Sequence, residues 1–501
     1  MQEVMQMENK TSLSIWKMYR AKKHASKVIS GTEMEQYSKL WDYCEEIYRT
    51  NPDTTIKVKC KHDVVSQTCI FKRIYICWGA LKKGFMAGCR PIIGLDGTHI
   101  KTTAGGVLLC AVGIDGNNNM FSVAYAYVLK ENTKTWEWFI ALIMENLCVE
   151  NSHMWTIISD KQKGLIKAVE KLLPNAEHRF CVRHMYNNFK QNLEAASATR
   201  VVDFNAEMEK LKACDRRAYD WVRARPEKHW AKSHFNVWPK CDMLLNNFCE
   251  SFNNVILKAR DKPIITMLET IRVILMKRLH IQRAKVLKFS GEVCPSIQKN
   301  LENNKKEASS YILVWNGGDK FEVQEWNGDK WTVDLTLRNC SCRRWELTGI
   351  PCVHATSCLF YRRESVEDYV DHWYKRGMFL RAYEYLLNPI TSSKEWPLAN
   401  LNPIVPWTNI QKKPGRPSQH ARRKELDELE AKKYGIKRHG AKYTCSNCGA
   451  RGHNKKGCPE PSHATMPSMS TRKFKIPVTI IFPYYCFAIF LIIQLLILNL
   501  L

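Results

Sequence analysis

The sequence predicts an α/β fold followed by small metal-binding modules, and three observations lead to that prediction. Three short apolar runs are separated by turns that contain Gly and Asn, and they cover 91–95, 107–112 and 121–128. A stretch with helical spacing, from Trp136 to Leu147, precedes a further apolar run at 155–158. Two clusters of Cys and His then follow in the second half of the chain.

The order of these elements is strand, strand, strand, helix, strand, which is the order of an RNase H-like core. We expect this core over 89–285, interrupted at about 164–246 by a helical insertion rich in aromatic and basic residues. Helical spacing resumes at Phe252 and continues through Leu275, with Arg and Lys on the other side of the helix. The predicted class is therefore an RNase H-like α/β core with an α-helical insertion, plus small zinc-binding modules.

The segments on either side of the core are predicted from spacing and composition. Residues 1–88 are expected to form a helical lead-in, because aromatic and apolar residues recur at helical spacing after Trp16 and again after Tyr37. Strand-like alternation predicts a compact unit at 311–387. Beyond it we expect a Pro-rich and basic linker at 388–442, a small module at 443–460 and a hydrophobic tail at 476–501.

The charge of the chain indicates a polyanionic partner. Its 501 residues include 76 Lys and Arg against 49 Asp and Glu, a net charge of +27 that exceeds what solubility requires. A basic protein of the ribosome or of a membrane surface is the plainer interpretation. With 45% hydrophobic residues and 16 Trp, most of the chain should fold. The 20 Cys, without an apolar N-terminal signal, indicate thiols and metal ligands in a reducing compartment rather than disulfides.

Three acidic residues lie where a catalytic metal site would require them. Asp96 and Asp160 each end an apolar run, and Glu250 opens the helix after the insertion. Two-metal phosphoryl transfer needs carboxylates from separate elements that meet at one point, where a pair of Mg²⁺ ions about 4 Å apart holds the attacking and leaving oxygens. Aspartates at the ends of neighbouring strands suit that need. The alternative is that each acid caps a helix or fills a turn.

A cluster in the 311–387 unit has the ligands of a structural zinc site. Cys340, Cys342, Cys352 and His354 supply three thiolates and an imidazole in the order C-x-C…C-x-H. Four such ligands close a tetrahedral Zn²⁺ site, whereas the alternative is a set of unconnected buried thiols and a core histidine.

A second cluster has the spacing C-x2-C-x4-H-x4-C of a zinc knuckle, formed by Cys445, Cys448, His453 and Cys458. Glycines at 449, 452 and 457 permit its tight turns. Such knuckles commonly bind single-stranded nucleic acid, and they can also bind protein. The sequence therefore predicts two structural Zn²⁺ sites.

Several words of the sequence closely resemble the transposases of plant Mutator-like elements, the MULE or MuDR family. They are Gly94-Leu95-Asp96-Gly97-Thr98-His99, Ile158-Ser159-Asp160 with Gly164-Leu165, Asn246-Asn247-Phe248-Cys249-Glu250, Glu131-Asn132 with Trp136-Glu137-Trp138-Phe139, and His178-Arg179-Phe180-Cys181-Val182-Arg183-His184. The C-x-C…C-x-H order resembles the SWIM zinc finger that follows the core in the same group. The resemblance extends from about Tyr19 to the basic linker.

This resemblance implies a DDE transposase whose catalytic acids are Asp96, Asp160 and Glu250, with Mg²⁺ or Mn²⁺ as the catalytic metal. The family's C-x2-H element falls on Cys181 and His184, which either join ligands from elsewhere in a metal site or hold the insertion against the core. DNA is the implied partner and the nucleus the implied location. A homo-oligomer is one candidate assembly.

The basic linker carries the unit Lys412-Lys413-Pro414-Gly415-Arg416-Pro417. It resembles an AT-hook, in which an extended Gly-Arg-Pro core lies in a narrow A·T minor groove. Lys412, Lys413 and Arg416 are therefore candidate DNA-binding residues. A nuclear localisation signal or a solvated linker is the alternative.

Two functions follow from these patterns. The first is a transposase-like protein that, if active, uses the three acids to hold Mg²⁺ for DNA strand cleavage and transfer. The second is a domesticated, catalytically silent derivative that acts as a DNA-binding transcriptional regulator, similar to the far-red-response transcription factors. The intact acid trio favours the enzyme. The sequence has no Cys before Cys44, so we expect it to lack the N-terminal zinc domain usual in the family, and this expectation favours the silent derivative.

The hydrophobic tail has no charge from Val478 to Leu501 and follows the basic segment Arg472-Lys473-Phe474-Lys475. It is long enough to span a bilayer with a basic flank, so a tail-anchored membrane location is the alternative to the nucleus. Translated non-coding sequence is another explanation of this segment.

Overall fold

The computed structural model describes Arg20, 32–64, 67–102, 104–183, 194–407 and Asn447. The chain divides into two units, and the larger, Tyr37–Arg438, contains the features that follow except the start of helix α3 (Glu33–Ser38). The knuckle ligands, the AT-hook-like unit, His184 and the hydrophobic tail all lie outside the described residues.

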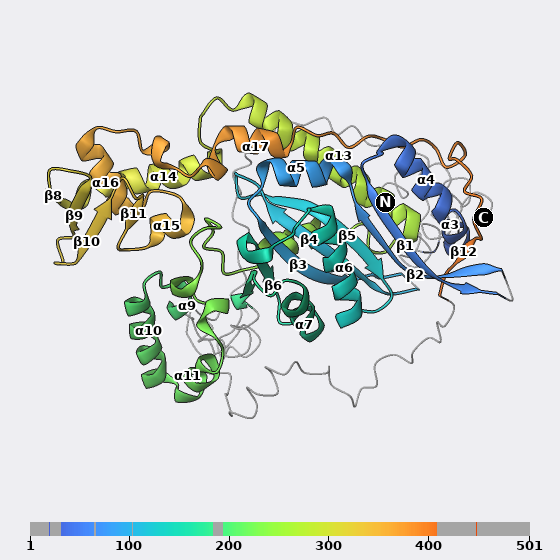
Figure 1. The fold of residues 1–501 in the computed structure, drawn as a ribbon, viewed down its shortest axis with the longest axis horizontal. Helices are drawn as coiled ribbons and strands as arrows, with labels where there is room; N and C mark the ends of the chain where they lie inside the picture. The colour runs from blue at the N-terminus through green and yellow to red at the C-terminus, as the bar shows by residue number, and fades with distance from the viewer. Residues whose placement is uncertain are drawn as a thin grey trace. The chain divides into compact units, whose positions relative to one another are not determined.

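A mixed sheet occupies the centre of the larger unit (Figure 1). Its strands in the described residues are β1 (Thr55–Asp63), β2 (Thr68–Cys77), β3 (Ile92–His99), β4 (Val107–Ile114), β5 (Met120–Val128), β6 (Thr156–Ser159), β7 (Glu177–Phe180) and β12 (Ile404–Val405). They lie in the order β1-β2-β5-β4-β3-β6-β7, and β12 pairs with β2. Strands β3, β4 and β5 form an antiparallel meander, whereas β6 and β7 run parallel to β3.

The predicted α/β class is confirmed, and β3 to β6 lie where the four apolar runs are. Strands β4 and β5 are buried along their whole length, so their side chains read as continuous apolar runs rather than as an alternating pattern. The helices of this part are α5 (Gly79–Gly88), α6 (Thr133–Asn146), α7 (Lys163–Leu172), α12 (Asn247–Val255), α13 (Ile264–Lys288) and α17 (Arg376–Ala382). Helix α12 packs across β3, β4 and β5, and α6 packs against α7.

The lead-in predicted as helical over 1–88 contains two strands. Helices α3 (Glu33–Ser38) and α4 (Leu40–Thr50) are present, but the chain then forms the antiparallel pair β1 and β2, which extends the central sheet. In β2, Phe71 and Ile74 to Cys77 are buried, while β1 carries lysines between its apolar residues. The helical prediction is wrong here. Lysines alternate with Ile56, Val58 and Cys60, which is the two-residue pattern of a half-buried strand, and the helical spacing of the aromatic residues before it does not extend into this segment.

The insertion is also shorter than predicted, because α7 and β7 belong to the sheet layer rather than to the insertion. From here on, the insertion means residues 194–246. It contains α9 (Glu194–Ser197), α10 (Val201–Cys214), α11 (Arg216–Arg223) and the short 3-10 turns η2 (Glu227–His229) and η3 (Lys232–His234). Its helices pack on a separate small core that includes Phe204, Trp221 and Trp230. Figure 1 shows α10 and α11 grouped away from the central sheet.

The predicted unit at 311–387 contains a second, antiparallel sheet of order β11-β10-β9-β8. Its strands are β8 (Ile312–Trp315), β9 (Lys320–Gln324), β10 (Lys330–Asp334) and β11 (Asn339–Cys340). Helices α14 (Pro295–Glu307), α15 (Arg344–Thr348) and α16 (Val353–Arg362) accompany them. We call residues 311–374 the finger. The end of the predicted unit differs, since α17 packs on α5 of the core.

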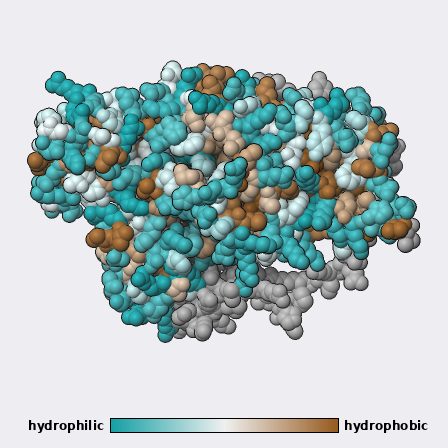
Figure 2. Space-filling model, viewed as in Figure 1, coloured by the Kyte–Doolittle hydropathy of each residue, from teal (hydrophilic) through white to brown (hydrophobic). Residues whose placement is uncertain are grey.

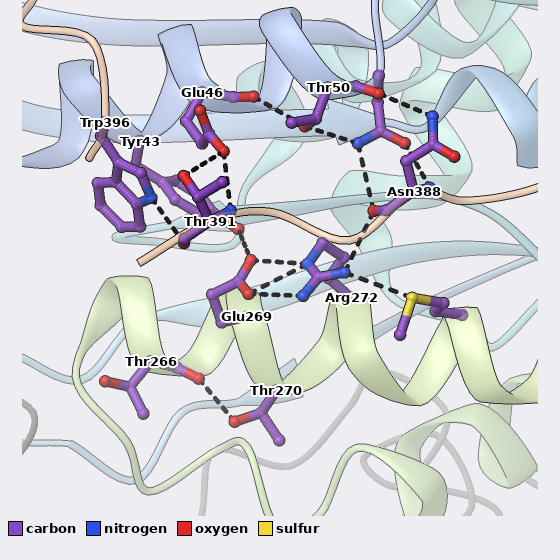
Figure 3. A network of polar contacts seen from close by, with 12 residues as sticks. Tyr43, Glu46, Thr50, Thr266, Glu269, Thr270, Arg272, Asn388, Thr391 and Trp396 are labelled. Atoms are coloured by element: carbon purple, nitrogen blue, oxygen red, sulfur yellow. Dashed lines mark hydrogen bonds and ion pairs between the residues drawn. The ribbon is translucent and has the colours of Figure 1, made fainter. Parts of the chain in front are cut away.

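The first part of the predicted linker is held against the core rather than extended from it (Figure 3). The backbone N–H of Asn388 donates to Asn51 at 2.9 Å, and the backbone N–H and hydroxyl of Thr391 donate to Glu46, each at 2.9 Å. Arg49 also donates to Glu46, and these donors lower the pKa of that carboxyl to about 2. The prediction of a linker is wrong for this segment because side-chain acceptors on α4 bind its backbone.

Every helix in the described part of the chain is too short or too polar to cross a membrane. The face seen in Figure 2 is mainly hydrophilic, with hydrophobic residues in small, separate patches.

Candidate active site and zinc centre

Asp96 and Asp160 lie at matching positions of neighbouring parallel strands. Leu95 of β3 pairs with Ser159 of β6, and each aspartate is the next residue of its chain segment. Both side chains are partly buried. Asp160 directly follows β6, as predicted, but Asp96 lies within β3, because pairing with β4 extends that strand to His99. Both aspartates are on the C-terminal side of the β3–β6 pairing, where two carboxylates can approach one another.

Helix α12 connects Glu250 to Asp96. The side-chain amide of Asn246 donates to the carbonyl of Leu95 at 3.1 Å, and Asn253 Nδ2 donates to Asp96 Oδ2 at 2.7 Å. Glu250 lies one turn before Asn253, so the two side chains are neighbours on the helix surface. A Cβ at Gly94 would lie 2.1 Å from the Phe248 ring, so glycine at this position allows the helix to approach β3 closely.

A fourth carboxylate, which the sequence did not single out, lies in the same region. A Cβ on Gly97 would be 3.0 Å from Glu131 Oε1, so this oxygen lies beside the Asp96–Gly97 backbone. Trp136 Nε1 donates to Glu131 Oε1 at 3.1 Å. Burial raises the pKa of Glu131, Trp136 opposes this effect, and the charge of Asp160 raises the pKa further. The only sequence signal was its place in the Glu131-Asn132 word. We call Asp96, Glu131, Asp160 and Glu250 the acid site.

Each of these acids has a protein partner of its own. Asp96 accepts from Asn253 and, through Oδ1, from the Gly97 N–H at 2.8 Å. Glu250 Oε2 lies 2.5 Å from Arg183 Nη1, with the two side chains 38% and 46% exposed. In the residues that the structure describes, the acid site does not form a group whose ligand atoms lie within 4.8 Å of one another. Carboxylate oxygens are nevertheless the donors that Mg²⁺ and Mn²⁺ prefer, and these are partly accessible.

A neutral histidine, His178, contacts the segment that carries Asp160 through the hydroxyl of Ser159. Ser159 Oγ lies 2.8 Å from His178 Nε2 and donates to the Asp160 carbonyl at 2.8 Å. Burial, together with the nearby His229, lowers the pKa of His178 to about 3, so this ring is uncharged at neutral pH.

The zinc ligands predicted in the finger form one compact group. Cys340, Cys342, Cys352 and His354 are all buried, and their ligand atoms lie within 4.8 Å of one another. The first two come from β11 and the turn after it, and the other two from the start of α16. The Trp331 ring stacks on His354 with centroids 4.8 Å apart. Three thiols and an imidazole in this arrangement fit a structural Zn²⁺.

The remaining predicted site residues are only partly described. Cys181 is buried and accepts from the Asn246 N–H at 3.4 Å, so it links the end of β7 to the start of α12. Its predicted partner, His184, lies outside the described residues, as do Cys445, Cys448, His453, Cys458, Lys412, Lys413 and Arg416.

Two family models match the chain. Residues 92–188 match the MULE transposase domain, and residues 321–356 match the SWIM zinc finger. The first match contains Asp96, Glu131 and Asp160, and the second contains the four clustered zinc ligands. No curated protein matches the chain. The chain thus carries two modules in an arrangement consistent with a MULE-family transposase, and the finger and its cluster indicate zinc binding.

Proposed function

We propose that this chain, in which a MULE transposase domain precedes a SWIM zinc finger, binds DNA and cleaves and joins its strands with divalent metal ions. The observation that carries the proposal is the pairing of β3 with β6, because it brings Asp96 and Asp160 to neighbouring positions. The hydrogen bond from Asn253 to Asp96 holds α12, the helix that carries Glu250, next to these aspartates. DNA as substrate and a nuclear location belong to this proposal.

We further propose that the core is RNase H-like. The order β5-β4-β3-β6-β7 supports this, since an antiparallel meander is followed by two strands parallel to its first member. In such a sheet, an acid within β3, an acid directly after β6 and an acid on a following helix can share one metal site.

In this proposal Asp96, Asp160 and Glu250 would hold Mg²⁺ or Mn²⁺, with Glu131 beside them. The bound metal would supply a Lewis acid that activates the attacking oxygen and stabilises the leaving one. Asn253 and the Gly97 N–H orient the two oxygens of Asp96. Arg183 places a guanidinium next to Glu250, where a DNA phosphate would meet it.

The test compares the full chain, loaded with zinc, with its Asp96→Asn and Asp160→Asn variants. Strand nicking and joining are measured with Mg²⁺ and with Mn²⁺, and DNA binding is measured in the same samples. We expect each substitution to lower the cleavage rate by at least about a hundredfold while DNA binding is retained. Asp53→Asn, which changes an exposed carboxylate paired with Lys83, is the matched control.

A catalytically silent, DNA-binding regulator is the second candidate. The ion pair of Glu250 with Arg183 favours it, because that carboxylate already has a positively charged partner. DNA binding without cleavage in the unsubstituted chain, under either metal, would contradict the enzyme and support the regulator.

A further inference from the structure

The zinc-binding turn of the finger, at Cys342 and Arg343, contacts the insertion. Arg343 follows the ligand Cys342, and its guanidinium donates to the carbonyls of Thr199 at 3.3 Å, Lys232 at 2.7 Å and Phe235. In the reverse direction, the Thr199 hydroxyl donates to the carbonyl of Cys342 at 2.8 Å. A zinc ligand and its neighbour are therefore hydrogen bonded to two separate segments of the insertion.

A second contact reaches the other half of the zinc cluster. The guanidinium of Arg200 lies 4.3 Å from the centroid of the Trp331 ring, which stacks in turn on the ligand His354. Arg343 itself has a φ of +63°, a left-handed conformation that is unfavourable for a residue with a side chain. Its three hydrogen bonds to backbone carbonyls compensate for that conformation.

The insertion continues this connection to the acid site. Ala195 and Ala196, close to Thr199, pack in the small core with Val182. The N–H of Val182 donates to the Leu244 carbonyl at 2.9 Å, and the next residue is Arg183, the partner of Glu250. Arg183, Ser197, Lys232 and the start of α12 line a common cavity of about 660 Å³.

We propose that the zinc centre of the finger holds the helical insertion in place, with Arg343 as the positioning residue, and that this turn is an internal interface and not a surface for nucleic acid. The coupling of zinc to the insertion stands independently of catalysis. The further step, in which the insertion keeps Arg183 beside Glu250 in the acid site, rests on the proposed function.

Hydrogen exchange of the full, zinc-loaded chain, followed by mass spectrometry, tests the coupling without reference to activity. We expect Arg343→Ala to speed exchange of amides in 194–235 by at least about tenfold, because it removes three hydrogen bonds. Arg343→Lys should have nearly the same effect, since an ammonium cannot reproduce the planar fork. Arg344→Ala, at the adjacent exposed arginine, is the matched control and should leave exchange unchanged.

Removal of zinc with a chelator should likewise speed exchange in 194–235. Normal protection of the insertion in Arg343→Ala, or after loss of the finger's zinc, would overturn the proposal. Full rescue by Arg343→Lys would overturn the role of the planar guanidinium as the positioning group. If Arg343→Ala also loosens β9 and β10, Thr199→Val decides the question from the insertion side. Faster exchange in 194–235 supports the coupling, and unchanged exchange rejects it.

Discussion

The zinc cluster of the finger and the acid site of the core differ in how their ligands are held. The four zinc ligands lie within 4.8 Å of one another and are buried. The acids are brought to one region by the sheet and α12, but Asp96 is held by Asn253 and Glu250 by Arg183. The ligands of the first site form one cluster, whereas the carboxylates of the second are distributed among protein partners.

The difference reflects the distance in sequence over which each site is built. Two tight turns, each next to a pair of ligands, gather the zinc cluster from a short segment of chain. The acid site requires β3, α6, β6 and α12 to pack correctly, and four carboxylates repel one another without a cation. A structural site therefore tolerates little change in its ligands, while a catalytic site can keep its fold when a ligand is altered.

The largest effect is expected for Cys352→Ser, which removes one zinc ligand. The chain should lose about one bound Zn²⁺, and the finger should be destabilised by at least about 5 kcal/mol, because metal binding supplies most of the folding free energy of such modules. Zinc content and exchange in β9 and β10 measure this. Cys358→Ser, a buried thiol outside the cluster, is the control and should retain the metal.

Metal titration of the acid site should give the next largest effect. Mg²⁺ or Mn²⁺ at a hundredfold excess over its Kd should stabilise the core by up to about 2.7 kcal/mol, because the ion binds only the folded site. Asp96→Asn should abolish that increase in thermal stability. In the absence of metal it should lower stability by about 1 kcal/mol, because an amide can accept only one of the two hydrogen bonds that Asp96 accepts from Asn253 and Gly97. An unchanged metal response in Asp96→Asn would remove this residue from the metal site.

Glu131→Gln should have a smaller effect that depends on pH. Because the pKa of Glu131 is raised in the folded state, the carboxylate destabilises the chain once the pH rises through that pKa. The variant, which keeps an acceptor for Trp136, should therefore be more stable than the unsubstituted chain at pH 8, by less than about 1 kcal/mol. The difference should vanish below about pH 4.3, where the carboxyl is protonated in both states. Thermal unfolding at both pH values, without metal, provides the measurement.

Arg183→Ala should change stability least, by about 0.5 kcal/mol or less, since both side chains of its ion pair are substantially exposed. It should nevertheless raise the affinity for Mg²⁺ by about threefold, because it removes the cation next to Glu250. Calorimetric titration with Mg²⁺ distinguishes the two effects. Unaltered affinity would indicate that Glu250 is not a metal ligand.

The sequence predicted β4 and β5 but missed β2, although its buried residues are apolar, and β7, whose burial is partly polar. Strands β4 and β5 are evident because every position is buried and apolar. Strand β7 is not, since its buried residues include Arg179 paired with Glu177 at 2.7 Å, with side chains 1% and 6% exposed. The two opposite charges of such a pair compensate one another inside the protein. In the sequence, however, two charged residues so close together are typical of a surface segment.

The same distinction applies to the sites. The four zinc ligands of the finger were predictable from spacing, and the positions of Asp96 and Asp160 from the apolar runs before them. Glu131 was not, because its approach depends on the missing side chain of Gly97 in a distant strand. Arg343 left no signal either, since a guanidinium bound to backbone carbonyls imposes no residue type on its partners.

The chain enters and leaves the α14–finger region at one place. Val293 and Lys375 form an antiparallel bridge, the Cys294 N–H donates to Tyr374 at 2.9 Å, and the Arg376 N–H donates to Glu292 at 2.7 Å. Helices α13 and α17, on either side of this paired neck, both belong to the core. The finger is therefore a closed excursion from the core, and its position is set at two places, this neck and the zinc-binding turn that contacts the insertion.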